Sequence, residues 1–203
     1  MTLWAIVPVK PLRRGKSRLA GSLSEEERAE LNQSLLQHTL KTLTRLKDVE
    51  QVLVVSRDPQ ALTIARQHGA RTVLEDGQPQ LNTALTRATV VAKVYATRGV
   101  LILPADLPLI SEEDVLTLIE RAVDPPVIVI APDRHGKGTN ALLISPAGLI
   151  EYDFGDNSFE KHCELAKEAG ARLEIVDLPT LGLDLDVPED LEIIKELEKT
   201  ITF

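Results

Sequence analysis

Basic side chains cluster in a short segment directly after the first apolar run of the chain. The segment KPLRRGKSRL carries Lys10, Arg13, Arg14, Lys16 and Arg18. Lysine supplies a point charge and arginine a bidentate fork, so this segment has the chemistry to hold a polyphosphate. A solvated basic loop is the alternative, but the position after the first strand of an acidic protein favours phosphate binding. The glycine spacing matches neither a P-loop nor a dinucleotide-binding fingerprint.

Aspartates with the chemistry to bind a divalent cation stand at two distant places. Asp106 follows an apolar run and lies between two prolines that restrict the local backbone. In the late segment GLDLDVPEDL, Asp184 and Asp186 point to the same side if that stretch is extended. Carboxylate oxygens are the ligands that Mg2+ prefers. Each carboxylate also has a structural alternative, because aspartates commonly cap turns and helices.

The late aspartates are not equivalent as metal ligands. Asp186 stands just before Pro188 and is placed to cap the last predicted helix. Asp184 is therefore the better candidate for a second ligand, with Asp186 close behind. Asp190 lies inside that helix, so we expect it to be solvated.

Two further segments have the composition of an anion site. GKGTNALLIS puts Thr139 at the start of a predicted strand, and FGDNSFEKH puts Gly155 and Ser158 just before a predicted helix. A helix N-terminus after a glycine-containing loop readily binds an anion. Ordinary capping by Asn157 or Ser158 explains the second segment equally well. His162, one turn into the helix, is expected to be structural or exposed rather than catalytic.

Alternating strands and helices would position all of these residues. Apolar runs predict strands at residues 3–9, 51–56, 71–74, 100–103, 126–131, 141–144 and 173–176. Helical spacing and capping signals predict helices that begin near Ser24, Pro59, Asn82, Ser111, Phe159 and Pro188. This alternation predicts an α/β fold of three layers (α/β/α) with a mainly parallel sheet, in which ligands bind at the carboxyl ends of the strands. Residues 132–158 break the alternation, and we expect a substrate-binding insertion there.

Bulk properties narrow the class of protein. A chain of 203 residues suits one domain spanning residues 1–203. A formal net charge of −8 argues against a broad nucleic-acid surface. The single cysteine, Cys163, excludes an intramolecular disulfide, and no signal peptide or membrane span is evident. We therefore expect a cytoplasmic protein without a nucleic-acid or membrane partner; a homodimer is one option that the sequence leaves open.

Five segments, in this order, resemble one known family. PVKPLRRGKSRLAGSLS, LPADLPLI, GTNALLISP, FGDNSFEKH and GLDLDVPEDL are similar to segments of the guanylyltransferases of coenzyme F-420 biosynthesis. These enzymes use 2-phospho-L-lactate in archaea and phosphoenolpyruvate in bacteria. The resemblance covers nearly the whole chain. The wider relatives are the sugar-nucleotide and molybdopterin nucleotidyltransferases of the GT-A-like fold, whose first loop is richer in glycine.

The resemblance implies a role for the charged positions. Asp106 and one aspartate of the pair Asp184 and Asp186 would hold Mg2+. Lys16 and Arg18 would bind the phosphates of GTP and take part in catalysis with Asp106. Lys10, in the same cationic segment, is assigned to the nucleotide as well.

The resemblance also implies two pockets. Leu81 and Asn82 match the nucleotide-pocket stretch of the family. Thr139, Gly155 and Ser158 match positions that hold the phosphorylated acid.

The expected reaction is GMP transfer from GTP to phosphoenolpyruvate or 2-phospho-L-lactate, with release of pyrophosphate. The attacking phosphate has a second pKa of about 6 and is already ionised at neutral pH, so it needs little help from a base. Catalysis would then rest on positioning and charge neutralisation. The alternatives are a molybdopterin or sugar-phosphate nucleotidyltransferase and a non-catalytic nucleotide-binding protein on the same fold. Guanine specificity rests on the resemblance alone, and phosphoenolpyruvate is slightly favoured because the chain looks bacterial.

Overall fold

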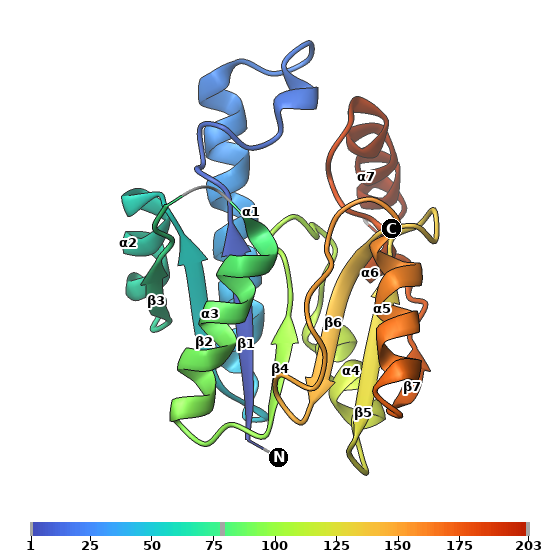
Figure 1. Ribbon diagram of the computed structural model, residues 1–203. Coiled ribbons are helices and arrows are strands. Elements are labelled where there is room, and N and C mark those ends of the chain that lie inside the picture. The colour runs from blue at the N-terminus through green and yellow to red at the C-terminus, as the bar shows by residue number, and fades with distance from the viewer. Residues whose placement is uncertain (1, 78–79, 202–203) are drawn as a thin grey trace.

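A single seven-stranded sheet forms the centre of the computed structural model, which describes residues 2–77 and 80–201 (Figure 1). The strand order is β3-β2-β1-β4-β6-β5-β7. The strands are β1 (Leu3–Val9), β2 (Val49–Ser56), β3 (Arg71–Leu74), β4 (Gly99–Ile102), β5 (Val127–Pro132), β6 (Thr139–Ser145) and β7 (Arg172–Ile175). The turn-rich composition of residues 75–80 predicts a turn before the helix that begins near Asn82, and part of that segment lies outside the described residues.

Helices cover both faces of this sheet, with α3 and α5 in front and α1 and α4 behind in Figure 1. The helices are α1 (Glu25–Arg45), α2 (Pro59–Gln67), α3 (Leu81–Val94), α4 (Glu112–Arg121), α5 (Ser158–Glu168), α6 (Pro179–Gly182) and α7 (Pro188–Ile201). A short 3-10 helix, η1 (Ser17–Leu19), lies in the cationic segment. The capping box that the sequence predicts at Ser24 is present, because the Ser24 side chain and Glu27 bond each other's backbone N–H groups.

The alternation of side chains along β1 explains the three layers. Leu3, Ala5 and Val7 face the core cluster formed with α1, α2 and α4, whereas Trp4 and Ile6 face the cluster formed with α3 and α5. All five side chains are almost completely buried. A central strand covered on both faces must be apolar throughout, which is why the sequence shows no polar alternation there. The predicted three-layer α/β fold is confirmed.

The sheet departs from parallel pairing at one strand. β6 runs antiparallel to both β4 and β5, while the other neighbouring strands are parallel. The predicted break at residues 132–158 therefore corresponds to a β5–β6 hairpin followed by the long connection from β6 to α5. As a substrate-binding insertion, this segment remains a prediction.

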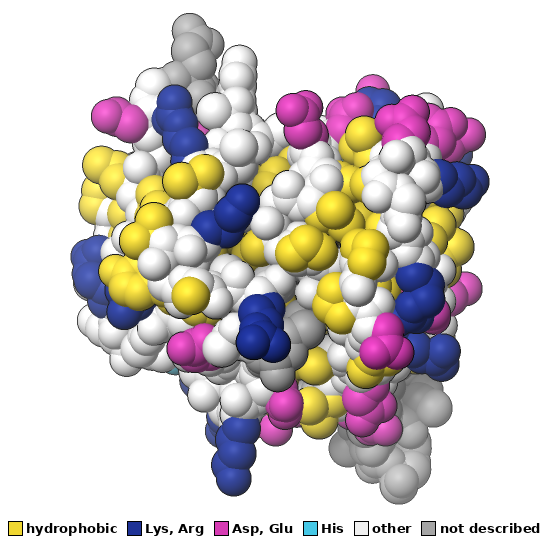
Figure 2. Space-filling model, turned by 60° about the horizontal axis from the view of Figure 1, so that its bottom comes forward, with side chains coloured by type: hydrophobic (Ala, Val, Ile, Leu, Met, Phe, Trp, Pro, Cys, Tyr) yellow, Lys and Arg dark blue, Asp and Glu magenta, His cyan; other side chains and the backbone are white. Residues whose placement is uncertain are grey.

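The surface carries charges of both signs. On the face shown in Figure 2, Lys and Arg side chains lie scattered among acidic and hydrophobic ones rather than in a continuous stripe. Within the described part of the chain, every helix is too short or too polar to cross a lipid bilayer.

Candidate active site

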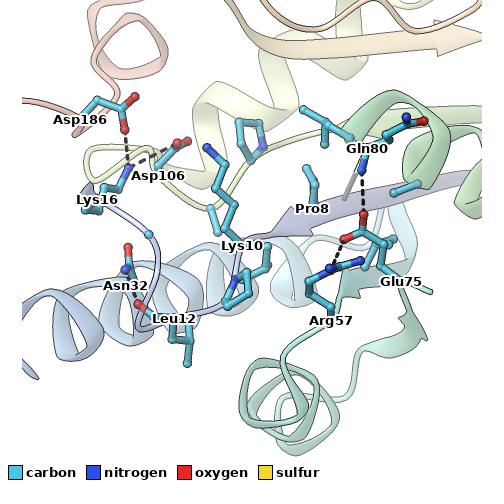
Figure 3. A pocket seen from close by; sticks show the side chains of 18 residues that line it. Pro8, Lys10, Leu12, Lys16, Asn32, Arg57, Glu75, Gln80, Asp106 and Asp186 are labelled. Carbon is cyan, nitrogen blue, oxygen red and sulfur yellow. Dashed lines mark hydrogen bonds and ion pairs between the residues drawn. The ribbon is translucent and has the colours of Figure 1, made fainter. Parts of the chain in front are cut away.

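A cavity of about 420 Å³ opens where the carboxyl ends of β1, β2 and β4 meet (Figure 3). Its volume falls in the range usual for small-molecule sites, roughly 300–1,000 Å³. Figure 3 shows polar groups at two ends of this cavity, with Lys10 between them. One end holds Lys16, Asp106 and Asp186, and the other holds Arg57, Glu75 and Gln80.

Lys16 joins the two acidic segments. Its ammonium nitrogen lies 2.9 Å from Asp186 Oδ1 and 3.4 Å from Asp106 Oδ2. Only 6% of the Lys16 side chain is exposed. Burial lowers the pKa of Lys16, but Asp106 and Asp186 raise it by more, so the net pKa lies above the ordinary value. The residues that the sequence places 90 and 170 positions from Lys16 therefore meet around one buried cation.

Backbone geometry aims Lys16 into the cavity. Lys16 has a φ of 57°, in the left-handed region that non-glycine residues rarely adopt. The preceding Gly15 approaches Asn32 so closely that an added Cβ would lie 2.7 Å from Asn32 Nδ2. Asn32 Nδ2 in turn donates a hydrogen bond of 2.7 Å to the Leu12 carbonyl. Glycine at position 15 thus lets the loop close onto α1 and present Lys16.

The late acidic segment docks beside Asp106 through its backbone. The Leu185 N–H donates a hydrogen bond of 3.0 Å to the Asp106 carbonyl. Asp190 accepts from the N–H groups of Asp186 and Val187 at 2.6 and 2.7 Å, and also pairs with Arg134.

The expectation that Asp190 is solvated was wrong, because only 2% of it is exposed. Asp190, rather than Asp186, caps the start of α7, since its carboxylate bonds the N–H groups of residues 186 and 187. That leaves the carboxylate of Asp186 available for Lys16.

The surroundings of the two late carboxylates shift their pKa values in opposite directions. Burial, followed by repulsion from Asp106 and Asp186, raises the pKa of Asp184. Burial also raises the pKa of Asp186, but attraction to Lys16, assisted by Lys10 and Arg18, lowers it by more. A further positive charge near Asp184 would relieve this repulsion.

The donors at this end of the cavity fit a magnesium ion. Asp106 Oδ1 is buried and has no hydrogen-bond partner among the described residues. All candidate ligands are carboxylate oxygens, which suit a hard cation. Among the described residues no three acidic, His or Cys side chains form a ready-made metal cluster. Lys16 is the cation that bridges Asp106 and Asp186 in this structure.

The opposite end of the cavity contains polar residues that sequence analysis missed. Arg57 Nε lies 3.6 Å from Glu75 Oε2, and the Gln80 N–H donates a hydrogen bond of 3.2 Å to Glu75 Oε1. Arg57 immediately follows β2 and Glu75 immediately follows β3. A polar residue directly after a predicted strand was the signal that could have found them.

The remaining residues predicted to bind the nucleotide lie in different surroundings. Lys10 and Leu81 line the cavity, and Arg18 is exposed on η1. The amide of Asn82 exchanges two hydrogen bonds with the Phe154 backbone, of 3.2 and 2.9 Å. Asn82 therefore holds the connection that leads from β6 to α5.

The three residues predicted to bind the acid gather around the N-terminus of α5. The Phe159 N–H donates to the Lys137 carbonyl at 3.0 Å, which joins the start of α5 to the start of β6. Thr139 and Ser158 are both buried, while Gly155 is exposed with a φ of 137°. The N-cap residue Asn157 makes no side-chain capping bond, so the capping alternative does not hold for its side chain.

Hydrogen bonds join this second cluster to the segment that carries the late aspartates. Asn140, the neighbour of Thr139, donates hydrogen bonds to the Leu181 and Gly182 carbonyls. A hydrogen bond from Asn140 also lowers the otherwise raised pKa of Asp184. The strand that carries Thr139 thus touches the segment that carries the late aspartates.

His162 is completely buried, so the structural alternative applies to it. Its Nδ1 lies 3.0 Å from Thr139 Oγ1, and its Nε2 accepts from the Asp153 N–H at 3.1 Å. Burial, modified by Asp153 and Lys161, lowers its pKa to about 4.

The depressed pKa of His162 predicts a loss of stability in mild acid. Between pH 6.5 and 4 the unfolded chain binds a proton at this position that the folded chain does not, so unfolding becomes easier as the pH falls. From pH 7 to 5 the free energy of unfolding should fall by about 2 kcal/mol more in the wild type than in His162→Asn. Urea unfolding of both proteins at both pH values measures this difference, and equal losses would contradict the assignment.

Comparison with known proteins identifies the family of this chain. The family described as "Guanylyl transferase CofC like" matches residues 3–201. A phosphoenolpyruvate guanylyltransferase of Rubrobacter xylanophilus is 42% identical over 191 residues, covering 94% of this chain and 92% of that relative. A 2-phospho-L-lactate guanylyltransferase of Methanothermobacter thermautotrophicus is 38% identical over 201 residues, covering 98% of this chain and 87% of that relative.

Solved structures share the fold at low sequence identity. A nucleotidyl transferase of Methanothermobacter thermautotrophicus superposes with a TM-score of 0.72 at 18% identity, covering 98% of this chain and 99% of that one. A 4-diphosphocytidyl-2C-methyl-D-erythritol synthase of Anaerococcus prevotii superposes with a TM-score of 0.67 at 12% identity, covering 98% of this chain and 96% of that one. With the family match over nearly its whole length, the chain belongs to the CofC-like guanylyl transferase family and is a nucleotidyltransferase.

Proposed function

We propose that this protein transfers GMP from GTP to phosphoenolpyruvate in a magnesium-dependent reaction of coenzyme F-420 biosynthesis. The observation that carries the proposal is the meeting of Asp106 and Asp186 at Lys16, in a cavity at the carboxyl ends of the strands. The chemistry of this centre is that of polyphosphate binding, because it pairs a buried cation with carboxylates suited to Mg2+. The relative from Rubrobacter xylanophilus, named for phosphoenolpyruvate, is the basis for the choice of acid.

In the proposed arrangement, the triphosphate lies at the end of the cavity that holds Lys10 and Lys16. The guanine lies toward Arg57 and Glu75, whose guanidinium and carboxylate offer both donors and acceptors to a base. Lys16, together with Arg18 from the exposed side of η1, neutralises the pyrophosphate as it leaves. When bound to Asp106 and the late aspartates, Mg2+ would supply further charge neutralisation at the triphosphate.

The acid is held by Thr139, Ser158 and the backbone around Gly155. An oxygen of its phosphate forms a bond to the α-phosphorus of GTP while the bond from that phosphorus to the β-phosphate oxygen breaks. No proton needs to be removed from the nucleophile, because its second pKa is about 6. The protein contributes orientation for in-line attack and cationic groups that reduce repulsion between two anions.

A pyrophosphate-release assay tests the proposal. We expect release with GTP and phosphoenolpyruvate in the presence of Mg2+, weaker release with 2-phospho-L-lactate, and none with ATP, CTP or UTP. Turnover only with a sugar phosphate or a molybdopterin would favour the other nucleotidyltransferase classes. Nucleotide binding without turnover of any acceptor would favour a non-catalytic protein. The chain has one cysteine and no membrane-spanning helix among the described residues, and we propose that the reaction takes place in the cytoplasm.

Ser158→Ala should raise the KM for the acid by about tenfold and leave the KM for GTP within twofold. Loss of a hydrogen bond to a charged group weakens binding by roughly this amount. Steady-state kinetics with each substrate varied in turn provide the measurement. Ser34→Ala, an exposed serine on α1, is the matched control and should change neither constant. An unaltered acid KM in Ser158→Ala would remove Ser158 from the proposed site.

A further inference from the structure

The partners of His162 determine which of its nitrogens carries the proton. The Asp153 backbone N–H points at Nε2 from 3.1 Å, and a backbone N–H acts only as a donor. Nε2 must therefore present a lone pair. Because the buried ring is neutral, its proton sits on Nδ1.

This tautomer sets the direction of the next hydrogen bond. His162 Nδ1–H donates to Thr139 Oγ1 across 3.0 Å. The Thr139 hydroxyl then acts as acceptor toward the histidine, and its own proton must point elsewhere. Among the described residues no other side chain or backbone atom bonds Thr139 Oγ1. A buried hydroxyl proton without a partner is costly, so it marks a place for an external acceptor.

Surrounding contacts hold the imidazole in this orientation. The Phe154 ring packs edge-on against it, with centroids 4.7 Å apart and planes at 67°. Both hydrogen bonds between Asn82 and the Phe154 backbone fix the segment that supplies the Asp153 N–H. Lys161 pairs with the Asp153 carboxylate at 3.1 Å on the outer side of the same segment.

The helix geometry brings a second hydroxyl to the same place. Ser158 and His162 are four residues apart in α5 and so share one face of the helix. Ser158 is 2% exposed, and its hydroxyl makes no hydrogen bond to the described residues. Two adjacent segments therefore each present a hydroxyl donor that the protein itself leaves unused.

We propose that His162 is a positioning residue that directs the Thr139 hydroxyl proton toward the anionic group of the acceptor. The inference rests on the proposed function in one respect, namely that the acid binds at Thr139. His162 touches neither substrate and moves no proton. Its effect is to make Thr139 a donor in one fixed direction before the acid arrives, which lowers the ordering cost of binding.

Two substitutions separate this role from a purely structural one. The amide nitrogen of asparagine is separated from the backbone by the same number of bonds as Nδ1 of histidine. The amide group of glutamine is separated from it by the same number of bonds as Nε2. His162→Asn can therefore still donate to Thr139, while His162→Gln keeps only the contact to the Asp153 N–H. We expect the KM for the acid to rise about tenfold in His162→Gln and to stay within threefold of the wild-type value in His162→Asn. The KM for GTP should stay constant in both variants.

Kinetics on the double variant and spectroscopy on the free protein complete the test. In a Thr139→Val background, His162→Gln should add less than threefold to the acid KM, because the two residues act through one hydroxyl. In the substrate-free protein, long-range 1H–15N correlation spectra should show Nδ1 of His162 protonated and Nε2 unprotonated, with His162→Asn assigning the signals.

Each result of these experiments either supports or overturns the role of His162. The opposite ranking, with glutamine better than asparagine, would show that His162 serves only the Asp153 segment and would overturn the proposal. A proton on Nε2 would overturn it independently of any kinetics. If the wild type turned over no phosphorylated acid, the proposed function would fail and the role toward the acceptor with it, whereas the tautomer result would stand by itself.

Discussion

Asp106→Asn is expected to lower kcat by about 10²- to 10³-fold, the range typical of losing one electrostatic group aimed at a reacting centre. The change keeps the shape of the side chain and removes its charge. It takes away one counter-ion of Lys16 and replaces one of the two carboxylate oxygens by an amide NH2, which cannot bind a cation. Both effects should weaken the proposed binding of Mg2+ and of the triphosphate.

Magnesium titration of the pyrophosphate assay provides the measurement for Asp106→Asn. The variant should need a higher Mg2+ concentration for half-maximal rate than the wild type, because one anionic ligand is gone. Asp48→Asn, an exposed aspartate between α1 and β2, carries the same change of charge and should behave as the wild type. A variant that kept more than a tenth of the wild-type kcat at the wild-type Mg2+ requirement would remove Asp106 from the metal site.

Lys16→Met is the second change with a large expected effect, a fall of about 100-fold in kcat/KM for GTP. Methionine keeps much of the length of the side chain and removes the ammonium that lies between Asp106 and Asp186. Without it the pKa of Asp186 should rise, since attraction to Lys16 is the main cause that lowers it. The leaving pyrophosphate would also lose the buried cation that is proposed to neutralise it.

A thermal measurement separates this electrostatic effect from misfolding. With Lys16 gone, the carboxylates of Asp106 and Asp186 should bind Mg2+ more readily, so Mg2+ alone should raise the Tm of Lys16→Met more than that of the wild type. The control is Arg13→Met in the same loop. The Arg13 side chain is 63% exposed, and its ion pairs among the described residues are with Glu25 and Glu26. A wild-type kcat/KM in Lys16→Met would contradict the role of this residue.

The elements of the fold and one end of the cavity could be predicted because their signals are local. Apolar runs predicted the strands. Lys16 and Asp106 lie in the loops directly after β1 and β4, where the sequence alone places them at strand ends. Parallel strands bring their carboxyl ends to one edge, so two distant charged segments could be expected to meet there. Asp186 joined them because the late segment bonds back to the Asp106 carbonyl.

The roles of residues that depend on partners distant in the chain could not be predicted from the sequence. Asp190 looks like any acidic residue in the first turns of a helix, and only folding brings Arg134 to it. His162 has its partner Thr139 23 residues away, on a strand whose antiparallel direction the sequence did not reveal. Arg57 and Glu75 are single polar residues whose pairing depends on β2 and β3 being neighbours in the sheet.

The span of chain between Lys16 and Asp186 has a consequence for biosynthesis. All seven strands are complete by Ile175, yet both late aspartates come after that point. Because translation proceeds from the N-terminus, the segment that carries the late aspartates is made after all seven strands. A nascent chain that ended before that segment would leave Lys16 without Asp186, so the proposed GTP site would be complete only once residues 184–186 have been made and have docked beside Asp106.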